Sequence, residues 1–249
     1  MKKIDDEAQL YERAVKTLLL TKPHIFGNLG RSSVVFEKAI ASHSVIADAL
    51  IFSENYGIIG VEIKTDHDST TRLNRQLSAY KVVCDQVYVL CHDNKLEAVE
   101  RVLERYKHTS VGIVAYSTYE GEQALGIVKD SYPADEYKPE AILDVLWKSE
   151  VRALADVVSS PTKLTIIDMK RKLGESFNRF AMSVPPVFTN RMPKKSLINQ
   201  IITRIGKYQA HEIATMMFYE HIKDPEKALK YYMFRDDISL NEVLDGKKQ

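Results

Sequence analysis

Two acidic residues and a lysine stand close together in the first third of the chain. Asp48 comes fourteen residues before the tripeptide Glu62-Ile63-Lys64. Residues two apart on a strand share a face, so Glu62 and Lys64 would point the same way. A short polar connection that ends in Gly57 predicts a hairpin, with Asp48 opposite Glu62 or one position away. We therefore expect two carboxylates and an ammonium group on one small area of one sheet face.

Such a group of charges favours a divalent cation. Two adjacent carboxylates repel each other, and one would tend to keep a proton. Mg²⁺ removes this penalty because it takes oxygen ligands and keeps several waters for a phosphate and a nucleophile. The ion can polarise a phosphoryl oxygen, and the lysine can orient a water or offset developing charge. The carbonyl of Ile63, between the two side chains, is a further candidate ligand.

The same residues also fit a purely structural interpretation. A Glu-x-Lys on an exposed strand is usually a solvated ion pair. Here the tripeptide is flanked by Ile58, Ile59 and Val61, which indicates an interior strand, where Asp and Lys are unusual. The spacing therefore favours a metal-dependent phosphodiesterase site over a surface ion pair.

A predicted helix after this strand carries a polar stripe. Arg72, Gln76 and Tyr80 are spaced i, i+4, i+8, and an apolar stripe beside them would pack on the sheet. We expect the helix to begin within Asp66 to Ser69, because Asp and Ser are favoured N-caps, and to end near Val83. Asp68 is expected as an N-cap rather than a metal ligand. The polar stripe could hold phosphate or steady the lysine.

The surrounding elements are predicted by hydrophobic periodicity. Helices are expected at 5–20 and 95–106, and strands at 34–40, 44–53, 58–65, 86–91 and 111–116. This order predicts an α/β fold with a mixed sheet flanked by helices. A polar connection is expected at 117–138, a helix from Pro139, and helical periodicity through 196–232. We expect one domain at 1–130 and a mainly helical, partly basic region at 131–249.

Charge is distributed unevenly, although the 249-residue chain has a net charge of only +1. Residues 163–207 contain ten basic and two acidic residues. This asymmetry fits either a surface for a polyanion or a solvated helical face, and the sequence weighs the two about evenly. The candidate nucleic-acid contacts are Arg72, Lys170, Arg171, Lys172, Lys194 and Lys195.

Several other classes of site lack their sequence signals. Cys84 and Cys91 have no metal-ligand companions and read as buried small hydrophobes. The histidines are scattered, so zinc is not expected. There is no Gly-x-Ser-x-Gly elbow and no Walker-type phosphate loop. No apolar run approaches the length of a membrane span, so we expect a cytoplasmic protein.

Asp48, Glu62-x-Lys64 and Gln76-x-x-x-Tyr80 together resemble the PD-(D/E)xK nuclease superfamily, in particular its RecB-like branch. The run from Val61 to Tyr80 also resembles a family of small bacterial and prophage proteins within that superfamily. The resemblance implies a restriction-endonuclease-like α-β-β-β-α-β core, Mg²⁺ or Mn²⁺ dependence and hydrolysis of nucleic acid. We expect DNA as the substrate.

The resemblance also assigns roles to residues. It implies that Asp48 and Glu62 are metal ligands, that Lys64 is the catalytic lysine, and that Gln76 and Tyr80 position substrate or water. Ala47 stands where the superfamily's name has Pro. An upstream glutamate often completes such sites, and we prefer Glu37 on the first strand to Glu12 on the first helix.

Two other functions remain as alternatives. The chain could be a catalytically silent nucleic-acid-binding or assembly protein that keeps the fold, or a regulatory or toxin-like partner in a larger complex. The complete Asp/Glu/Lys set favours an active nuclease, because a silent copy would tolerate the loss of one member. The sequence does not specify whether the substrate is DNA or RNA, whether it is single- or double-stranded, or whether the enzyme is an endonuclease or an exonuclease. It also leaves open the pathway (repair, recombination, restriction or phage defence) and homo-oligomer formation.

Overall fold

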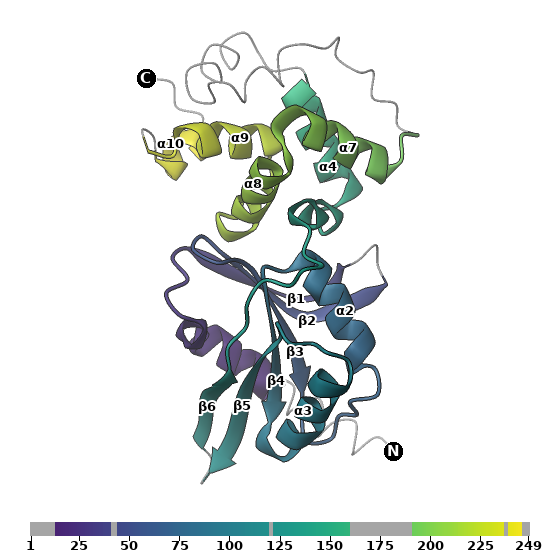
Figure 1. Cartoon of the computed structure of the whole chain (residues 1–249). Coiled ribbons are helices and arrows are strands. Elements are labelled where there is room, and N and C mark those ends of the chain that lie inside the picture. Colours follow the sequence, from purple (N-terminus) through teal and green to yellow (C-terminus); the bar gives the residue numbers. More distant parts are fainter. Residues whose placement is uncertain (1–12, 41–43, 120–121, 160–190, 237–238, 246–249) are drawn as a thin grey trace, which may run out of the picture. The chain divides into compact units, whose positions relative to one another are not determined.

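The computed structural model describes residues 13–40, 44–119, 122–159, 191–236 and 239–245 (Figure 1). Contacts divide the chain into two compact units, Met1–Lys138 and Pro139–Gln249. The division falls eight residues after the boundary expected at 130. The first unit is α/β and the second is helical, as the sequence predicted.

The first unit is built on a six-stranded mixed sheet with its strands in sequence order. The strands are β1 Ser32–Ile40, β2 Val45–Ser53, β3 Gly57–Lys64, β4 Gln86–His92, β5 Gly112–Tyr119 and β6 Glu122–Lys129. β1, β2 and β3 form an antiparallel meander, and β3, β4 and β5 are parallel. β6 then returns antiparallel to β5.

The two parallel connections carry helices, as crossovers between parallel strands require. α2 (Leu73–Val83) follows β3, and α3 (Leu96–Arg105) follows β4 after the short 3₁₀ turn η2 (Asp93–Lys95). α2 packs against β2, β3 and β4 (Figure 1). Before the sheet, residues 13–21 are helical and a 3₁₀ turn, η1, covers Pro23–Phe26.

The two faces of the sheet are divided by the period-2 alternation of strands. Ile59, Val61 and Ile63 of β3 face one cluster, with Val15 and Leu19 of the first helix. The even-numbered positions of the same strand, which include Glu62 and Lys64, therefore face the other side. That second face is the one on which α2 lies, because a Cβ at Gly60 would meet the ring of Tyr80.

Two local expectations were wrong. The stretch expected as a polar connection at 117–138 contains β6 and the end of β5. Its short apolar core, Leu125 to Val128, is interrupted by Gly126 and pairs on one side only, so the strand signal is weak.

α2 begins at Leu73, later than the expected start at Asp66 to Ser69. The carboxylate of Asp68 instead accepts hydrogen bonds from the backbone nitrogen and hydroxyl of Thr65, at 2.8 and 2.7 Å. Asp68 thus closes the turn at the end of β3 and is not the N-cap of α2.

In the part of the second unit that the structure describes, all regular elements are helices. These are η3 Pro139–Asp144, α4 Lys148–Ser159, α7 Lys194–Ile205, α8 Lys207–Tyr219, α9 Pro225–Phe234 and α10 Leu240–Asp245. The helical periodicity predicted for 196–232 is confirmed. Pro139 opens a 3₁₀ helix, and the α-helix expected there begins only at Lys148.

Cys84 and Cys91 are both buried with free thiols, as expected. No described helix combines the length and apolar character needed to cross a membrane.

Candidate functional site

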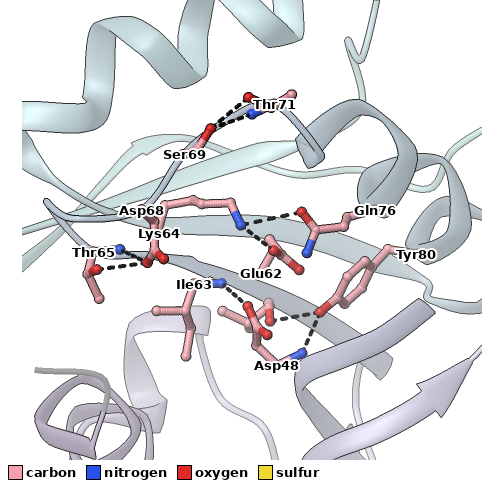
Figure 2. Close-up of polar contacts among 11 residues, drawn as sticks. Asp48, Glu62, Ile63, Lys64, Thr65, Asp68, Ser69, Thr71, Gln76 and Tyr80 are labelled. Carbon is pink, nitrogen blue, oxygen red and sulfur yellow. Dashed lines mark hydrogen bonds and ion pairs between the residues drawn. The ribbon is translucent and has the colours of Figure 1, made fainter. Parts of the chain in front are cut away.

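The hairpin of β2 and β3 brings Asp48 to Glu62. The paired ladder ends at Ala49 opposite Val61, so Asp48 and Glu62 are the next positions in register. One carboxylate oxygen of Asp48, Oδ2, accepts a hydrogen bond of 2.8 Å from the backbone nitrogen of Ile63 (Figure 2). The expectation that Asp48 lies opposite Glu62 agrees with this register.

Lys64 binds Glu62 on the same face of β3. The ammonium nitrogen lies 2.6 Å from Oε1 of Glu62 and 3.3 Å from Oε1 of Gln76 (Figure 2). Glu62 is 0% exposed and Lys64 is 7% exposed, so this ion pair lies in the interior of the unit. Gln76, one turn into α2, thereby links this helix to Lys64, the candidate catalytic lysine on β3.

The second oxygen of Glu62 is buried and has no hydrogen-bond partner in the structure. Burial, together with repulsion by Asp48, raises the pKa of the Glu62 carboxyl to about 7, although Lys64 and the Tyr80 hydroxyl act in the opposite direction. A buried carboxylate oxygen without a partner is costly. The site therefore favours a group that can bring positive charge or a hydrogen to this oxygen.

Tyr80 supports this site from inside the core. Its side chain is fully buried, and its hydroxyl accepts a hydrogen bond from the Asp48 backbone nitrogen at 2.8 Å. The same hydroxyl donates to the carbonyl of Val61 at 3.2 Å (Figure 2). Burial holds the pKa of the Tyr80 hydroxyl well above its usual range, so it remains a donor. Of the predicted polar stripe of Arg72, Gln76 and Tyr80, Gln76 contacts the lysine, whereas Tyr80 is a core residue.

The residues present fit a divalent cation of the magnesium type. Asp48 and Glu62 supply carboxylate oxygens, the ligands that Mg²⁺ prefers, and one of these oxygens is buried without a partner. Within the described ranges no third His, Cys, Asp or Glu joins them in a group that could hold a metal. Mg²⁺ commonly binds through one or two carboxylates and completes its shell with water and phosphate.

A family model described as Bacteriophage P4 protein cII matches residues 5–215 of the chain. The chain belongs to this family. Protein cII of Enterobacteria phage P4 is 26% identical over 145 residues, which cover 58% of this chain and 53% of that protein. The chain thus matches about half the length of this phage relative. The phage relationship agrees with the prophage resemblance of the sequence.

In this cII-family chain, Glu37 does not join the carboxylate pair. Its backbone has a φ of 53° and its carboxylate contacts the ammonium of Lys16 at 2.7 Å. The Glu37 side chain is 71% exposed. Its expected role as a metal ligand therefore has no support in the geometry. The competing candidate, Glu12, lies outside the described residues.

The expected nucleic-acid contacts are in three different situations. Arg72 and Lys195 are exposed. Lys194 instead donates to the backbone carbonyls of Asp144 and Leu146, both at 2.6 Å, so we correct its role to a structural one. Lys170, Arg171 and Lys172 lie outside the described residues. The described end of the basic segment also contains Arg204, which is buried.

Sequence reasoning identified the acidic pair and the lysine but not what holds them. Thr65 and Asp68 close the end of β3, whereas the sequence predicts the start of a helix within Asp66 to Ser69. Gly60 was the available signal for the core position of Tyr80, because a Cβ at this position would collide with the Tyr80 ring.

Proposed function

We propose that this cII-family chain is a divalent-metal-dependent nuclease of the PD-(D/E)xK type that hydrolyses phosphodiester bonds, with DNA as its substrate. The observation that carries the proposal is the buried, unpartnered oxygen of Glu62, beside Asp48 and on the same face as Lys64. A carboxylate pair and a lysine buried together are expensive to maintain for stability alone. Metal-assisted phosphate chemistry uses all three groups.

The order of elements also supports the proposal. A helix at 13–21 is followed by β1, β2, β3, α2 and β4, which is the α-β-β-β-α-β order of the restriction-endonuclease-like core. The acidic pair and the lysine lie on the second and third strands, and Gln76 and Tyr80 lie on the following helix. Fold order alone does not establish activity, so the site carries the argument.

Each side chain has a distinct task in the proposed reaction. Asp48 and Glu62 would hold Mg²⁺ or Mn²⁺, which supplies Lewis acidity and a more acidic water when bound. Lys64 donates hydrogen bonds to the attacking water or to the phosphate oxygen on which charge develops. Gln76 keeps the Lys64 ammonium at the site, and Tyr80 fixes the backbone of Asp48.

The proposal is tested by a cleavage assay on circular and linear, single- and double-stranded DNA, with RNA as a further substrate. Cutting in Mg²⁺ or Mn²⁺ that is lost in EDTA and in Lys64→Ala is expected. Cleavage of the circular forms would identify an endonuclease. Lys81→Ala is the matched control, because Lys81 is also a buried lysine in an ion pair, with Glu136 at 2.7 Å, and lies outside the site.

A silent nucleic-acid-binding protein is the second candidate. It is favoured by the absence, within the described residues, of a third acidic group beside Asp48 and Glu62. Metal-dependent binding of DNA without cleavage of any substrate would support this candidate against the nuclease. Equal activity of Lys64→Ala and Lys81→Ala would refute the role of Lys64.

A further inference from the structure

The chain has a single tryptophan, and the second unit exposes it to solvent. Trp147 is 66% exposed, although the residues just before it are core residues. Val145 and Leu146 are exposed by only 2% and 3%. The Trp147 side chain therefore presents most of its surface to solvent, beside two residues that belong to the core. Tryptophan is the side chain with the largest flat apolar surface, and such surfaces are typical of binding sites.

The backbone beneath the indole is fixed from three directions. The nitrogen of Trp147 donates to Oε2 of Glu150 at 2.6 Å, and its carbonyl accepts the first hydrogen bond of α4, from Val151 at 3.0 Å. The carbonyl of Leu146 accepts from the Lys194 ammonium at 2.6 Å. Trp147 is thus the N-cap of α4 with a glutamate at N3 that reaches back. The backbone that carries the ring is therefore a preorganised support.

Basic residues lie on both sides of this support. Lys148 follows Trp147 and is exposed, and Lys194 brings the start of α7 against Leu146. α4 and α7 pack against each other (Figure 1). Lys195 and Arg191, next to and three residues before Lys194, are both exposed. We call Trp147, Lys148, Arg191 and Lys195 the tryptophan patch.

Acidic groups near the patch are engaged. Asp144 lies 3.9 Å from the Lys194 ammonium, and Glu150 caps the nitrogen of Trp147. With Lys194 counted, four basic residues face two acidic ones, so the local charge is positive. An exposed aromatic ring with Lys148 next to it in the chain, and with exposed Arg191 and Lys195 near the Lys194 that binds Leu146, matches the two parts of a nucleotide in a single strand. The base stacks on the ring, and the flanking phosphates contact the basic side chains.

We propose that the tryptophan patch binds single-stranded nucleic acid by stacking an unpaired base on Trp147. The inference rests on the proposed function only in that both have a nucleic acid as ligand. A duplex offers its phosphates but keeps its bases stacked inside, so it would engage only the basic residues. The patch therefore selects unpaired strands over paired ones.

The single tryptophan makes the proposal directly measurable. In EDTA, which prevents metal-dependent cleavage, the full chain is titrated with oligo-dT, oligo-U and a duplex of the same length, and Trp147 emission is recorded. Quenching by the single strands is expected, with an affinity that falls as salt rises. The ratio of the affinities for oligo-dT and oligo-U shows whether the patch prefers DNA or RNA. An unchanged emission at saturating oligonucleotide, shown by anisotropy of a labelled strand, would overturn the proposal.

Variants separate stacking from charge. Trp147→Ala is expected to weaken single-strand binding about 5- to 150-fold, the effect of one lost base-stacking contact, and Trp147→Phe should keep most of the affinity. Tyr106→Ala is the matched control, because Tyr106 is 46% exposed, follows Arg105 and precedes Lys107 in the first unit. Equal losses in Trp147→Ala and Tyr106→Ala, or equal quenching by the duplex, would contradict the patch.

The outcome is independent of the nuclease test. Quenching and a Trp147→Ala defect without any cleavage would leave the patch standing and remove the nuclease. Cleavage in Mg²⁺ with normal single-strand binding by Trp147→Ala would support the nuclease and refute the tryptophan patch.

Discussion

The hydroxyl of Tyr80 lies 2.8 Å from the backbone nitrogen of Asp48 and accepts its hydrogen. The same oxygen donates to the carbonyl of Val61, the last residue that pairs with the strand of Asp48. The Tyr80 hydroxyl thus binds the backbone groups of Asp48 and Val61 at the point where the pairing of β2 with β3 ends. The acidic pair stands at this opening, and α2 holds it in place.

Tyr80→Phe should therefore affect both stability and the site. The change removes the oxygen that makes hydrogen bonds with two backbone groups, and each such hydrogen bond contributes about 0.5–1.5 kcal/mol. We expect a fall of about 1–3 kcal/mol in the free energy of unfolding, measured by urea denaturation. Cleavage or metal affinity should fall as well, because Asp48 loses its backbone anchor.

Tyr88→Phe is the control for Tyr80→Phe. Tyr88 is also buried, on β4 of the same sheet, and its hydroxyl accepts from the nitrogen of Ser131 at 3.3 Å. A loss of stability without loss of metal affinity is expected there. If both variants changed metal affinity to the same degree, Tyr80 would have no specific role at the site.

The Glu62 carboxyl makes stability depend on pH in the absence of metal. Its pKa is raised from 4.5 to about 7 by burial and by Asp48, so the folded chain holds a proton that the unfolded chain has released. Between about pH 4.5 and 7 the folded state therefore binds more protons, and stability falls as pH rises through this window. Urea denaturation in EDTA should show this decline.

Glu62→Gln imitates the protonated carboxyl and provides the comparison. The amide oxygen of the variant can still accept a hydrogen bond from the Lys64 ammonium, so this lysine is not left without a partner. The variant and the wild type should therefore be about equally stable near pH 4.5, and the variant should be the more stable one above pH 7. Added Mg²⁺ should stabilise the wild type more at pH 8 than at pH 6, because the cation requires the ionised carboxylate. A wild-type advantage above pH 7 in EDTA would contradict the raised pKa.

The core of the site could be predicted because strands obey simple parity. The hairpin at Gly57 fixes the register, so Asp48 and Glu62 had to be neighbours, and Glu62 and Lys64 had to share a face. No such rule shows from the sequence how deeply a residue at the border of the apolar stripe of a helix is buried. For this reason Tyr80 was expected on a polar stripe, while the structure buries it completely.

Glu37 shows a different limit of the sequence. In a regular strand, Glu37 would stand opposite Asp48 and share its face, because Phe36 pairs with Ala49 and Lys38 with Ala47. Instead, the backbone of Glu37 takes a φ of 53° and leaves the ladder at this position. A left-handed residue inside a strand is a local irregularity that side-chain alternation does not reveal. The exposed ion pair with Lys16 follows from this irregularity.

The contribution of Lys64 to the stability of the fold should depend on the presence of the Glu62 carboxylate. Lys64→Met removes the ammonium 2.6 Å from Oε1 and leaves a buried carboxylate without its cation. Removing one partner of a buried pair typically costs about 3–5 kcal/mol, whereas replacing both partners is often neutral. The double variant Glu62→Gln/Lys64→Met should thus recover most of the stability that Lys64→Met loses in urea denaturation at pH 8. Additive losses would show that the pair is not coupled.

Gly60 gives the sharpest test of how α2 supports the site. A Cβ at this position would collide with the ring of Tyr80 and lie 2.7 Å from the sulfur of Cys84. Both atoms belong to fully packed side chains, so Gly60→Ala forces α2 away from β3. Overpacking of this kind typically costs about 1–3 kcal/mol. Because the displaced ring carries the hydroxyl that anchors Asp48, metal affinity should fall together with stability.

Gly126→Ala is the matched variant, since it makes the same change on β6 of the same sheet. A Cβ there meets no atom within 4 Å, and a strand alanine restricts the unfolded chain more than glycine does. Gly126→Ala should therefore leave metal affinity unchanged and alter the free energy of unfolding by less than about 1 kcal/mol. Calorimetric Mg²⁺ titrations of both variants check this difference. Unchanged metal affinity in Gly60→Ala, at a stability still sufficient for folding, would show that Asp48 does not depend on the position of Tyr80.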